Sequence, residues 1–313
     1  MSQLQETTKY RGRFAPTPSG MLHFGSLVTA VGSYLDARSH LGEWLVRIED
    51  IDRPRAKAGM SDKILSALEL FGMEWDGPVI YQSQCINHYR EALHFLETLE
   101  LIYACSCTRK EIADSTLFGF EGVIYPGNCR SSLHSQHDNR PRAVRIKTNA
   151  DRIEFQDRLQ GKVCQSIENE IGDFVLKRSD GIYTYQLAVV VDDGWQGITH
   201  IVRGADLLGS TPRQIFLQQL LRYPTPHYLH LPVVTTNQGE KLSKQTLAHP
   251  VDAKNPLPQL IAALDFLGQD PPLELIESDL DSFWQWAINN WSVTRIARVT
   301  HSPYNSLLNV TNE

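Results

Sequence analysis

The sequence predicts an α/β protein with a parallel sheet. Short apolar runs that suit strands alternate with segments of helical spacing over the first hundred residues, and this alternation is typical of a parallel sheet covered by helices. A turn rich in proline and glycine precedes the first helix, and an acidic cluster follows the second strand. In open parallel sheets, ligands bind at the carboxyl ends of strands, where both features are expected to lie.

Local patterns place the individual elements. Residues 13–15 open the first strand, which two prolines end. Apolar positions at helical spacing predict a helix over 26–39, with Ser26 as its N-cap. In chain order, we then expect a strand over 44–48, helices over 61–71 and 87–101, strands within 181–191 and 199–202, a helix over 211–222 with Pro212 in its first turn, and short helices over 256–267, 280–290 and 292–299.

The chain divides into four expected parts. The α/β pattern breaks off near Cys105, where scattered glycines and short alternating stretches begin, and it returns near residue 180. This change indicates an insertion of mixed α+β structure. We therefore expect the first half of an α/β domain over 1–104, the insertion over 105–179, the second half of the α/β domain over 180–250 and a small helical C-terminal region over 251–313.

Composition and charge restrict the class of protein. Of the 313 residues, 21% are charged and 42% hydrophobic, which is typical of a soluble globular chain rather than a disordered one. No apolar run is long enough to span a membrane, and the N-terminus lacks the apolar segment of a signal peptide. An odd count of five cysteines argues against a disulfide framework. We expect a cytoplasmic monomer.

One region is locally basic although the net charge is −6. A single acid, Asp138, lies among five cations between residues 130 and 147. This patch is a candidate RNA contact, and the alternative is a solvated loop and strand edge. Its cations are Arg130, Arg140, Arg142, Arg145 and Lys147.

Two motifs far apart in the sequence together indicate an ATP site. Residues 23–26 are His23-Phe24-Gly25-Ser26, after the Pro/Gly-rich turn, and residues 241–245 are Lys241-Leu242-Ser243-Lys244-Gln245. His23 and the backbone N–H groups around Gly25 would lie beside a triphosphate at the positive end of a helix dipole. Lys241 and Lys244 would neutralise charge on a departing pyrophosphate. We therefore expect His23, Lys241 and Lys244 to be catalytic, and His23, Gly25 and Lys244 to bind ATP.

These motifs resemble those of a known family, the class I aminoacyl-tRNA synthetases, and within it the glutamyl branch. Residues 23–26 stand where that class has its HIGH motif, residues 241–245 stand where it has KMSKS, and residues 13–20 are similar to the opening segment of the glutamyl branch. Ser26 replaces the last histidine of HIGH, which this branch tolerates. The resemblance covers roughly residues 10–250 and implies a Rossmann-like catalytic domain with a zinc-bearing insertion.

The resemblance also implies a site for glutamate. A ligand with one ammonium group and two carboxylates requires a buried acid and at least one arginine. By resemblance, Glu49 binds the α-amino group, and Tyr185 and Arg203 hold carboxylate or backbone groups of the ligand. On local grounds Tyr183 competes with Tyr185, because both would alternate on one strand face. The full implied set is Arg13, Phe14, Ala15, Pro16, Thr17, Glu49, Tyr185 and Arg203.

Three cysteines in the insertion indicate a structural zinc site. Cys105, Cys107 and Cys129 offer three thiolates, and structural zinc takes four ligands. The sequence alone offers His134 or His137 as the fourth. Some full-length glutamyl enzymes have a histidine two residues after the third cysteine, where this chain has Ser131. A shortened member of the family instead uses a tyrosine four residues before that cysteine, which implies Tyr125.

The resemblance suggests one activity, and two alternatives stay open. A full-length glutamyl enzyme continues into a large anticodon-binding region, whereas this sequence ends at residue 313. We therefore expect a shortened member that activates L-glutamate with ATP and Mg²⁺ without tRNA, and then attaches glutamate to the queuosine base in the anticodon of tRNA-Asp. The alternatives are a truncated glutamyl-tRNA synthetase that charges an acceptor end, and a non-catalytic synthetase-like protein that binds RNA or regulates.

Overall fold

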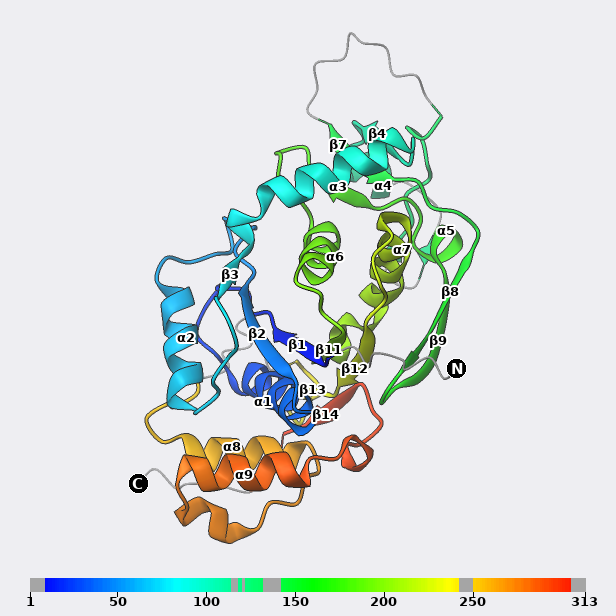
Figure 1. Ribbon diagram of the computed structural model, residues 1–313. Helices are drawn as coiled ribbons and strands as arrows, with labels where there is room; N and C mark the ends of the chain where they lie inside the picture. Colours follow the sequence, from blue (N-terminus) through cyan, green and yellow to red (C-terminus); the bar gives the residue numbers. More distant parts are fainter. Residues whose placement is uncertain (1–8, 114–117, 120–121, 132–141, 242–249, 305–313) are drawn as a thin grey trace, which may run out of the picture.

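The computed structural model describes residues 9–113, 118–119, 122–131, 142–241 and 250–304 (Figure 1). Its centre is a parallel sheet in two sections. In the first section, β2 (Glu43–Ile48) lies between β1 (Arg11–Phe14) and β3 (Ile80–Tyr81), and in the second, β11 (His200–Gly204) pairs with β12 (His227–Leu231). The Thr199 N–H donates to the Arg11 carbonyl at 3.0 Å and joins the sections. The order β3-β2-β1-β11-β12 is that of a doubly wound nucleotide-binding fold, so the predicted fold class is confirmed.

Helices cover both faces of this sheet, as Figure 1 shows. On one face pack α1 (Phe24–Ser39), α8 (Pro256–Phe266) and α9 (Leu280–Asn290). On the other face pack α3 (Ile86–Thr98), α6 (Tyr185–Trp195) and α7 (Thr211–Leu221). Strand β2 serves both layers, because its alternate side chains point to opposite faces. Trp44, Val46 and Ile48 enter the first core, and Leu45 packs against the second.

One predicted strand is wrong. Most of 181–191, which we expected to be β-structure, belongs to helix α6. Five consecutive apolar side chains in this helix are buried, so the sequence shows no polar face from which a helical period could be recognised. Those side chains are Leu187, Ala188, Val189, Val190 and Val191.

Two smaller expectations are also wrong. His23, not Ser26, is the N-cap of α1, and its Nδ1 accepts a hydrogen bond from the Ser26 N–H at 3.3 Å. The helix expected over 292–299 is only a 3-10 turn, η5 (Val293–Arg295). The chain then forms β14 (His301–Pro303), which pairs in parallel with β13 (Val233–Thr235). The remaining predicted helices and strands are present with shifted ends, and α2 (Met60–Leu70) follows β2 as expected.

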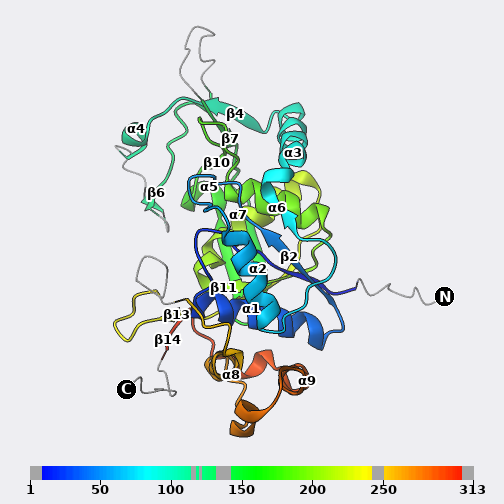
Figure 2. The same ribbon diagram turned by 90° about the vertical axis from the view of Figure 1, so that its left-hand side faces the viewer.

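The middle of the chain forms a separate antiparallel sheet at the end of the molecule away from α8 and α9 (Figure 2). It consists of β4 (Ile102–Cys105), β7 (Ala143–Ile146) and β10 (Val175–Lys177). A hairpin of β8 (Arg152–Asp157) and β9 (Gly161–Ser166) returns to the main sheet, where Asp157 pairs with Tyr228 of β12. The middle of the chain also contains the short elements α4 (Arg109–Ala113), β5 (Phe118–Gly119), β6 (Gly122–Val123) and α5 (Ile167–Glu170).

The C-terminal helices complete the first core. Helix α8 packs against α1, and the Trp284 Nε1–H of α9 donates to the Phe71 carbonyl at 2.9 Å, just beyond α2. The 3-10 turn η4 (Leu273–Glu277) connects the two helices. Within the described part of the chain, no helix combines the length and the apolar character needed to cross a membrane.

Candidate active site

The predicted site residues lie where β1, β2 and β11 end. Residues 15–22 form the turn after β1, and Glu49 directly follows β2. Arg203 is the second-to-last residue of β11. The Glu49 N–H donates to the Pro16 carbonyl at 3.0 Å, so the backbone ties the acid to the turn. This placement follows from a parallel sheet, because the carboxyl ends of its strands share one edge.

His23 and Gly25 stand at the start of α1. With Nδ1 of His23 accepting from the Ser26 backbone, Nε2 of the neutral ring is left to donate to Ser26 Oγ at 3.1 Å. The Gly25 carbonyl accepts from Thr29 Oγ1 at 3.1 Å. The 16-residue helix directs its positive dipole end at this turn, which suits binding of a phosphate.

The segment after the lysine loop returns to the described structure beside this turn, whereas Lys241 before it lies against β13 and Asp206. Lys241 bridges to Thr235 and its Nζ pairs with the Asp206 carboxylate, which follows β11. After the loop, Pro250 bridges to His23, and the Val251 N–H donates to the Leu22 carbonyl at 3.0 Å. Lys244 falls within 242–249, outside the described residues.

Glu49 and Arg13 belong to a buried network of charges that the sequence did not predict. Arg13 donates to Asp193 through Nε at 3.0 Å and through Nη2 at 3.3 Å. Arg47 Nη1 donates to the same carboxylate at 2.8 Å, and Arg47 Nη2 lies 3.5 Å from Glu49 Oε1. Arg47 Nε is 3.7 Å from Asp192 Oδ2. All five side chains are buried, so the network joins β1, β2 and α6 beneath the site.

Burial and charge act in opposite directions on these acids. Burial raises the pKa of Glu49 to about 7, against the guanidinium groups of Arg47 and Arg13, which lower it. Burial alone would also raise the pKa of Asp193, but the contacts with Arg13 and Arg47 hold it below its usual value. Burial raises the pKa of Asp192 as well, so two acids of this network, Glu49 and Asp192, hold a proton more tightly than usual.

Tyr185, the first residue of α6, and Arg203 of β11 contact each other. Arg203 Nη1 donates to the Tyr185 hydroxyl at 3.4 Å. Burial raises the pKa of Tyr185, the Arg203 guanidinium lowers it, and the Glu49 carboxylate raises it. Tyr183 faces elsewhere, because its ring packs against Tyr89 with centroids 5.4 Å apart and Lys177 lies over it. The structure therefore favours Tyr185.

A buried histidine orients Arg203. Arg203 Nε donates to His230 Nε2 at 3.0 Å, and Arg203 Nη2 donates to Thr211 Oγ1 at 2.8 Å. Because Nε2 accepts, the proton of the neutral ring is on Nδ1, which donates to Asp157 Oδ2 at 2.6 Å. Burial lowers the pKa of His230 to about 4, although the hydrogen bond that its ring donates to Asp157 raises it, so the ring is neutral at pH 7. The sequence did not predict these hydrogen bonds between Arg203, His230 and Asp157, because Asp157 belongs to the hairpin of the middle region.

We expect Asp157→Asn to lower the free energy of unfolding by about 2 kcal/mol. An asparagine that keeps its oxygen toward the backbone N–H groups of Leu159 and Gln160 turns its amide N–H₂ toward His230 Nδ1. The ring must then move its proton to Nε2, where it opposes the Arg203 N–H. Denaturant unfolding measures the loss, and the exposed Asp151→Asn is the control. Equal stability of the two variants would contradict the assigned tautomer.

The other residues implied for glutamate form the turn after β1. Phe14 is buried and stacks on Trp44 with centroids 6.1 Å apart, so only its backbone can face a ligand. Ala15, Pro16 and Thr17 are partly exposed, and the Thr17 carbonyl accepts from the Ser19 N–H at 2.8 Å. The turn therefore offers backbone groups and small side chains beside Glu49.

Cys105, Cys107 and Cys129 gather in the middle region as predicted. Their three Sγ atoms lie within 4.8 Å of one another. The Tyr125 hydroxyl is 3.4 Å from Cys105 Sγ and 3.5 Å from Cys107 Sγ. Sulfur atoms around a tetrahedral zinc with bonds of about 2.3 Å are separated by roughly 3.8 Å, so the donor set suits zinc. His134 and His137 lie outside the described residues.

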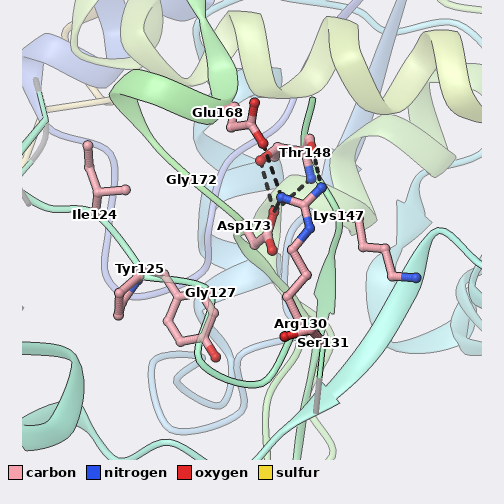
Figure 3. A pocket seen from close by; sticks show the side chains of 11 residues that line it. Ile124, Tyr125, Gly127, Arg130, Ser131, Lys147, Thr148, Glu168, Gly172 and Asp173 are labelled. Carbon is pink, nitrogen blue, oxygen red and sulfur yellow. Dashed lines mark hydrogen bonds and ion pairs between the residues drawn. The ribbon is translucent and has the colours of Figure 1, made fainter. Parts of the chain in front are cut away.

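Two cations of the basic patch make contacts within the middle region, and they differ in exposure, because Arg145 is buried whereas the Arg130 side chain is 36% exposed. Arg145 is buried, lies over the Tyr125 ring at 3.8 Å and donates to the Asp173 carbonyl at 2.7 Å. Arg130 donates to the Thr148 carbonyl at 2.6 Å and lies between two carboxylates in a cavity of about 550 Å³ beside the cysteines (Figure 3). Those acids are Glu168 and Asp173. Both arginines therefore hold the middle region together, while Arg140 is outside the described residues.

Comparison with known proteins agrees with this geometry. The family described as "tRNA synthetases class I (E and Q), catalytic domain" matches residues 9–262. The protein named glutamyl-Q tRNA(Asp) synthetase in Dechloromonas aromatica is 53% identical over 291 residues, covering 92% of this chain and 96% of that protein. Its namesake in Pseudomonas paraeruginosa is 50% identical over 301 residues, covering 96% of this chain and 100% of that protein.

Solved structures show the same fold. A glutamate tRNA ligase from Elizabethkingia meningosepticum, in complex with its amino acid, superposes with a TM-score of 0.75 at 24% identity, over 95% of this chain and 67% of that chain. The glutamate-tRNA synthetase of Elizabethkingia anophelis gives a TM-score of 0.76 at 23% identity, over 95% of this chain and 68% of that chain. The chain belongs to the class I tRNA synthetases of the E and Q type, a family of ligases.

Proposed function

We propose that this protein activates L-glutamate with ATP in the absence of tRNA and then transfers glutamate to the queuosine base in the anticodon of tRNA-Asp. The observation that supports activation best is the buried Glu49, set beside Arg13 and Tyr185 at the end of the sheet where α1 begins. The names of relatives about half identical in sequence support the second step.

The amino acid is held by opposite charges. Glu49 accepts the α-ammonium group of glutamate, and the guanidinium groups of Arg13 and Arg203 bind its carboxylates, with Tyr185 as a further donor. Among the described residues, Arg13 Nη1 and Glu49 Oε2 have no hydrogen-bond partner, so both atoms can turn to a ligand. Hydrogen bonds between charged groups are stronger than those between neutral groups.

Activation needs positioning and charge stabilisation rather than a protein nucleophile. The α-carboxylate oxygen of glutamate attacks the α-phosphorus of ATP, and the bond to the β-phosphate oxygen breaks, which gives glutamyl-adenylate and pyrophosphate. His23 and the backbone N–H groups near Gly25 bind the phosphates at the start of α1. Lys241 and Lys244 stabilise the charge that develops on pyrophosphate. Mg²⁺ bound to ATP would neutralise part of the phosphate charge there.

Transfer then uses the adenylate as the acyl donor. A nucleophilic group of the queuosine base attacks the glutamyl carbonyl carbon, and AMP leaves with the electrons of the broken bond.

The middle region has a structural role in this proposal. Cys105, Cys107 and Cys129, with Tyr125 as the fourth ligand, hold one zinc ion that fixes the segments between β4 and β7.

The direct test of activation is pyrophosphate exchange into ATP. With glutamate and Mg·ATP but no tRNA, the protein is expected to incorporate labelled pyrophosphate into ATP, and glutamine or aspartate at the same concentration should give little exchange. Glutamate-dependent exchange that appears only when tRNA is added would contradict the proposal of tRNA-independent activation.

A further inference from the structure

A buried pair of residues lies beneath the amino-acid site. Arg47 is fully buried on β2, two residues before Glu49 and on the same face of the strand. Asp193 is buried on α6 and accepts from Arg13 Nε and from Arg47 Nη1 at 3.0 and 2.8 Å. Arg47 Nη1 also donates to Gln196 Oε1 at 2.7 Å. Neither Arg47 nor Asp193 was among the residues expected to contact a ligand.

The pair connects the two groups that meet the amino acid. Asp193 accepts from Nε and Nη2 of Arg13, which leaves Nη1 without a hydrogen-bond partner among the described residues. Arg47 Nη2 of β2 donates to Glu49 Oε1 at 3.5 Å, which leaves Oε2 without a hydrogen-bond partner among the described residues. The positions of Arg13 on β1 and of Glu49 just after β2 are therefore fixed through one carboxylate and one guanidinium.

The network is also unbalanced in charge. The guanidinium groups of Arg13 and Arg47 face three carboxylates, those of Asp192, Asp193 and Glu49. Asp192 is held by Gln82 and Tyr89, and the hydroxyl of Tyr185 is the further titratable group near Glu49. When all are ionised, one negative charge is in excess, and a ligand ammonium group at Glu49 would balance it.

The network is a poor device for stability alone. Arg47 Nε is buried without a hydrogen-bond partner among the described residues, and such a donor costs about 1–3 kcal/mol. Replacing buried ion pairs by apolar side chains is often neutral or stabilising. We therefore expect these buried charges to serve the chemistry of the site rather than the stability of the fold.

We propose that Arg47 and Asp193 are positioning residues of the amino-acid site, which hold Glu49 and Arg13 in place and together set the charge that Glu49 presents to the substrate ammonium group. This inference rests on the proposed glutamate activation. Arg47 favours the carboxylate form of Glu49, whereas Asp193 disfavours it. The two residues therefore act on Glu49 in opposite directions although they contact each other.

The test is the pH dependence of kcat/KM for glutamate in tRNA-free pyrophosphate exchange at saturating Mg·ATP. Only ionised Glu49 pairs with an ammonium group, so in the wild type kcat/KM is expected to rise with pH through a midpoint at about 7. Arg47→Met is expected to move this transition up by about one pH unit or more, and Asp193→Asn to move it down by about one. At pH 7, a shift of one unit in Arg47→Met should therefore lower kcat/KM about fivefold, and kcat/KM should recover at higher pH.

Three further variants separate positioning from folding. Arg47→Lys keeps the charge and should return the transition toward the wild-type pH. Asp192→Asn removes another nearby negative charge and should move it down, which keeps the test usable if Arg47→Met does not fold. Arg158→Met is the matched control, because Arg158 forms a similar pair with Asp36 near the other end of α1. It should lower stability and leave the pH profile unchanged.

The outcomes are distinct. Opposite movements of the transition in Arg47→Met and Asp193→Asn support the inference, since loss of stability cannot produce both. Movement in the same direction, or none, in variants that fold as judged by circular dichroism overturns it while wild-type exchange keeps the proposed function standing. Absence of exchange by the wild type overturns the proposed function and this inference together.

Discussion

Glu49→Gln is expected to raise the KM for glutamate at least about a hundredfold and to leave the KM for ATP unchanged. The substitution keeps the shape of the side chain but removes the charge that the α-ammonium group meets. Loss of one partner of a buried charged hydrogen bond costs about 2–5 kcal/mol, and a hundredfold change corresponds to about 2.7 kcal/mol. Steady-state exchange kinetics with each substrate varied in turn measure both constants.

The same substitution has a second expected effect, on stability. Because the pKa of Glu49 rises from 4.5 in the unfolded chain to about 7 in the folded protein, the folded state binds the proton more tightly. The free energy of unfolding of the wild type therefore falls as pH rises from about 4.5 to 7. The Glu49→Gln variant has no carboxyl group to ionise here, so its stability does not fall in this way. The melting temperature of the variant minus that of the wild type should therefore be larger at pH 8 than at pH 5.

Glu43→Gln is the matched control for this prediction. Glu43 is on the same strand but at its other end, where it pairs with Lys9 and Arg11 near the surface. It should change neither KM. A Glu49→Gln variant with a wild-type KM for glutamate would contradict the role assigned to Glu49.

Removal of zinc is expected to have the largest effect on stability. We expect the purified protein to contain about one zinc per chain, and chelation or Cys107→Ala to open the region between β4 and β10. Structural zinc contributes on the order of 10 kcal/mol of binding free energy in small domains, which the antiparallel sheet of three short strands has no other means to replace. Metal analysis and limited proteolysis between residues 102 and 177 measure the two effects.

Two variants refine the zinc prediction. Tyr125→Phe removes only the phenolic oxygen and should release zinc to a chelator faster than the wild type does. Cys164→Ala changes a cysteine of β9 that lies outside the cluster and should keep the metal. A wild-type rate of zinc release from Tyr125→Phe would exclude Tyr125 as a ligand, and a metal-free protein of unchanged stability would contradict the site as a whole.

The sequence predicted the parts of the fold whose patterns are local. The helix after the Pro/Gly-rich turn and the strand before Glu49 have clear periods, and both are present. Helix α6 was mistaken for β-structure because its side chains are buried on every side. That error also hid Asp192 and Asp193, since a helix over the sheet is what brings this acidic pair to Arg47.

The rest of the site depends on contacts between segments far apart in the chain. Nothing in the local sequence of Asp157 connects it with His230, 73 residues away. Arg145 belonged to a basic run, but the run contains no sign that the Tyr125 ring covers its guanidinium group. Alternation along β2 did offer one usable signal, because Arg47 and Glu49 must share a face of the strand.

The most direct measurement of the central claim is glutamate transfer to a matched pair of tRNA-Asp samples, one with and one without queuosine, each with its 3′-terminal adenosine removed. The proposed function predicts transfer of labelled glutamate to the queuosine-containing tRNA alone. Transfer that requires the 3′-terminal adenosine, or that is equal for the two samples when this adenosine is present, would contradict it and indicate charging of the acceptor end.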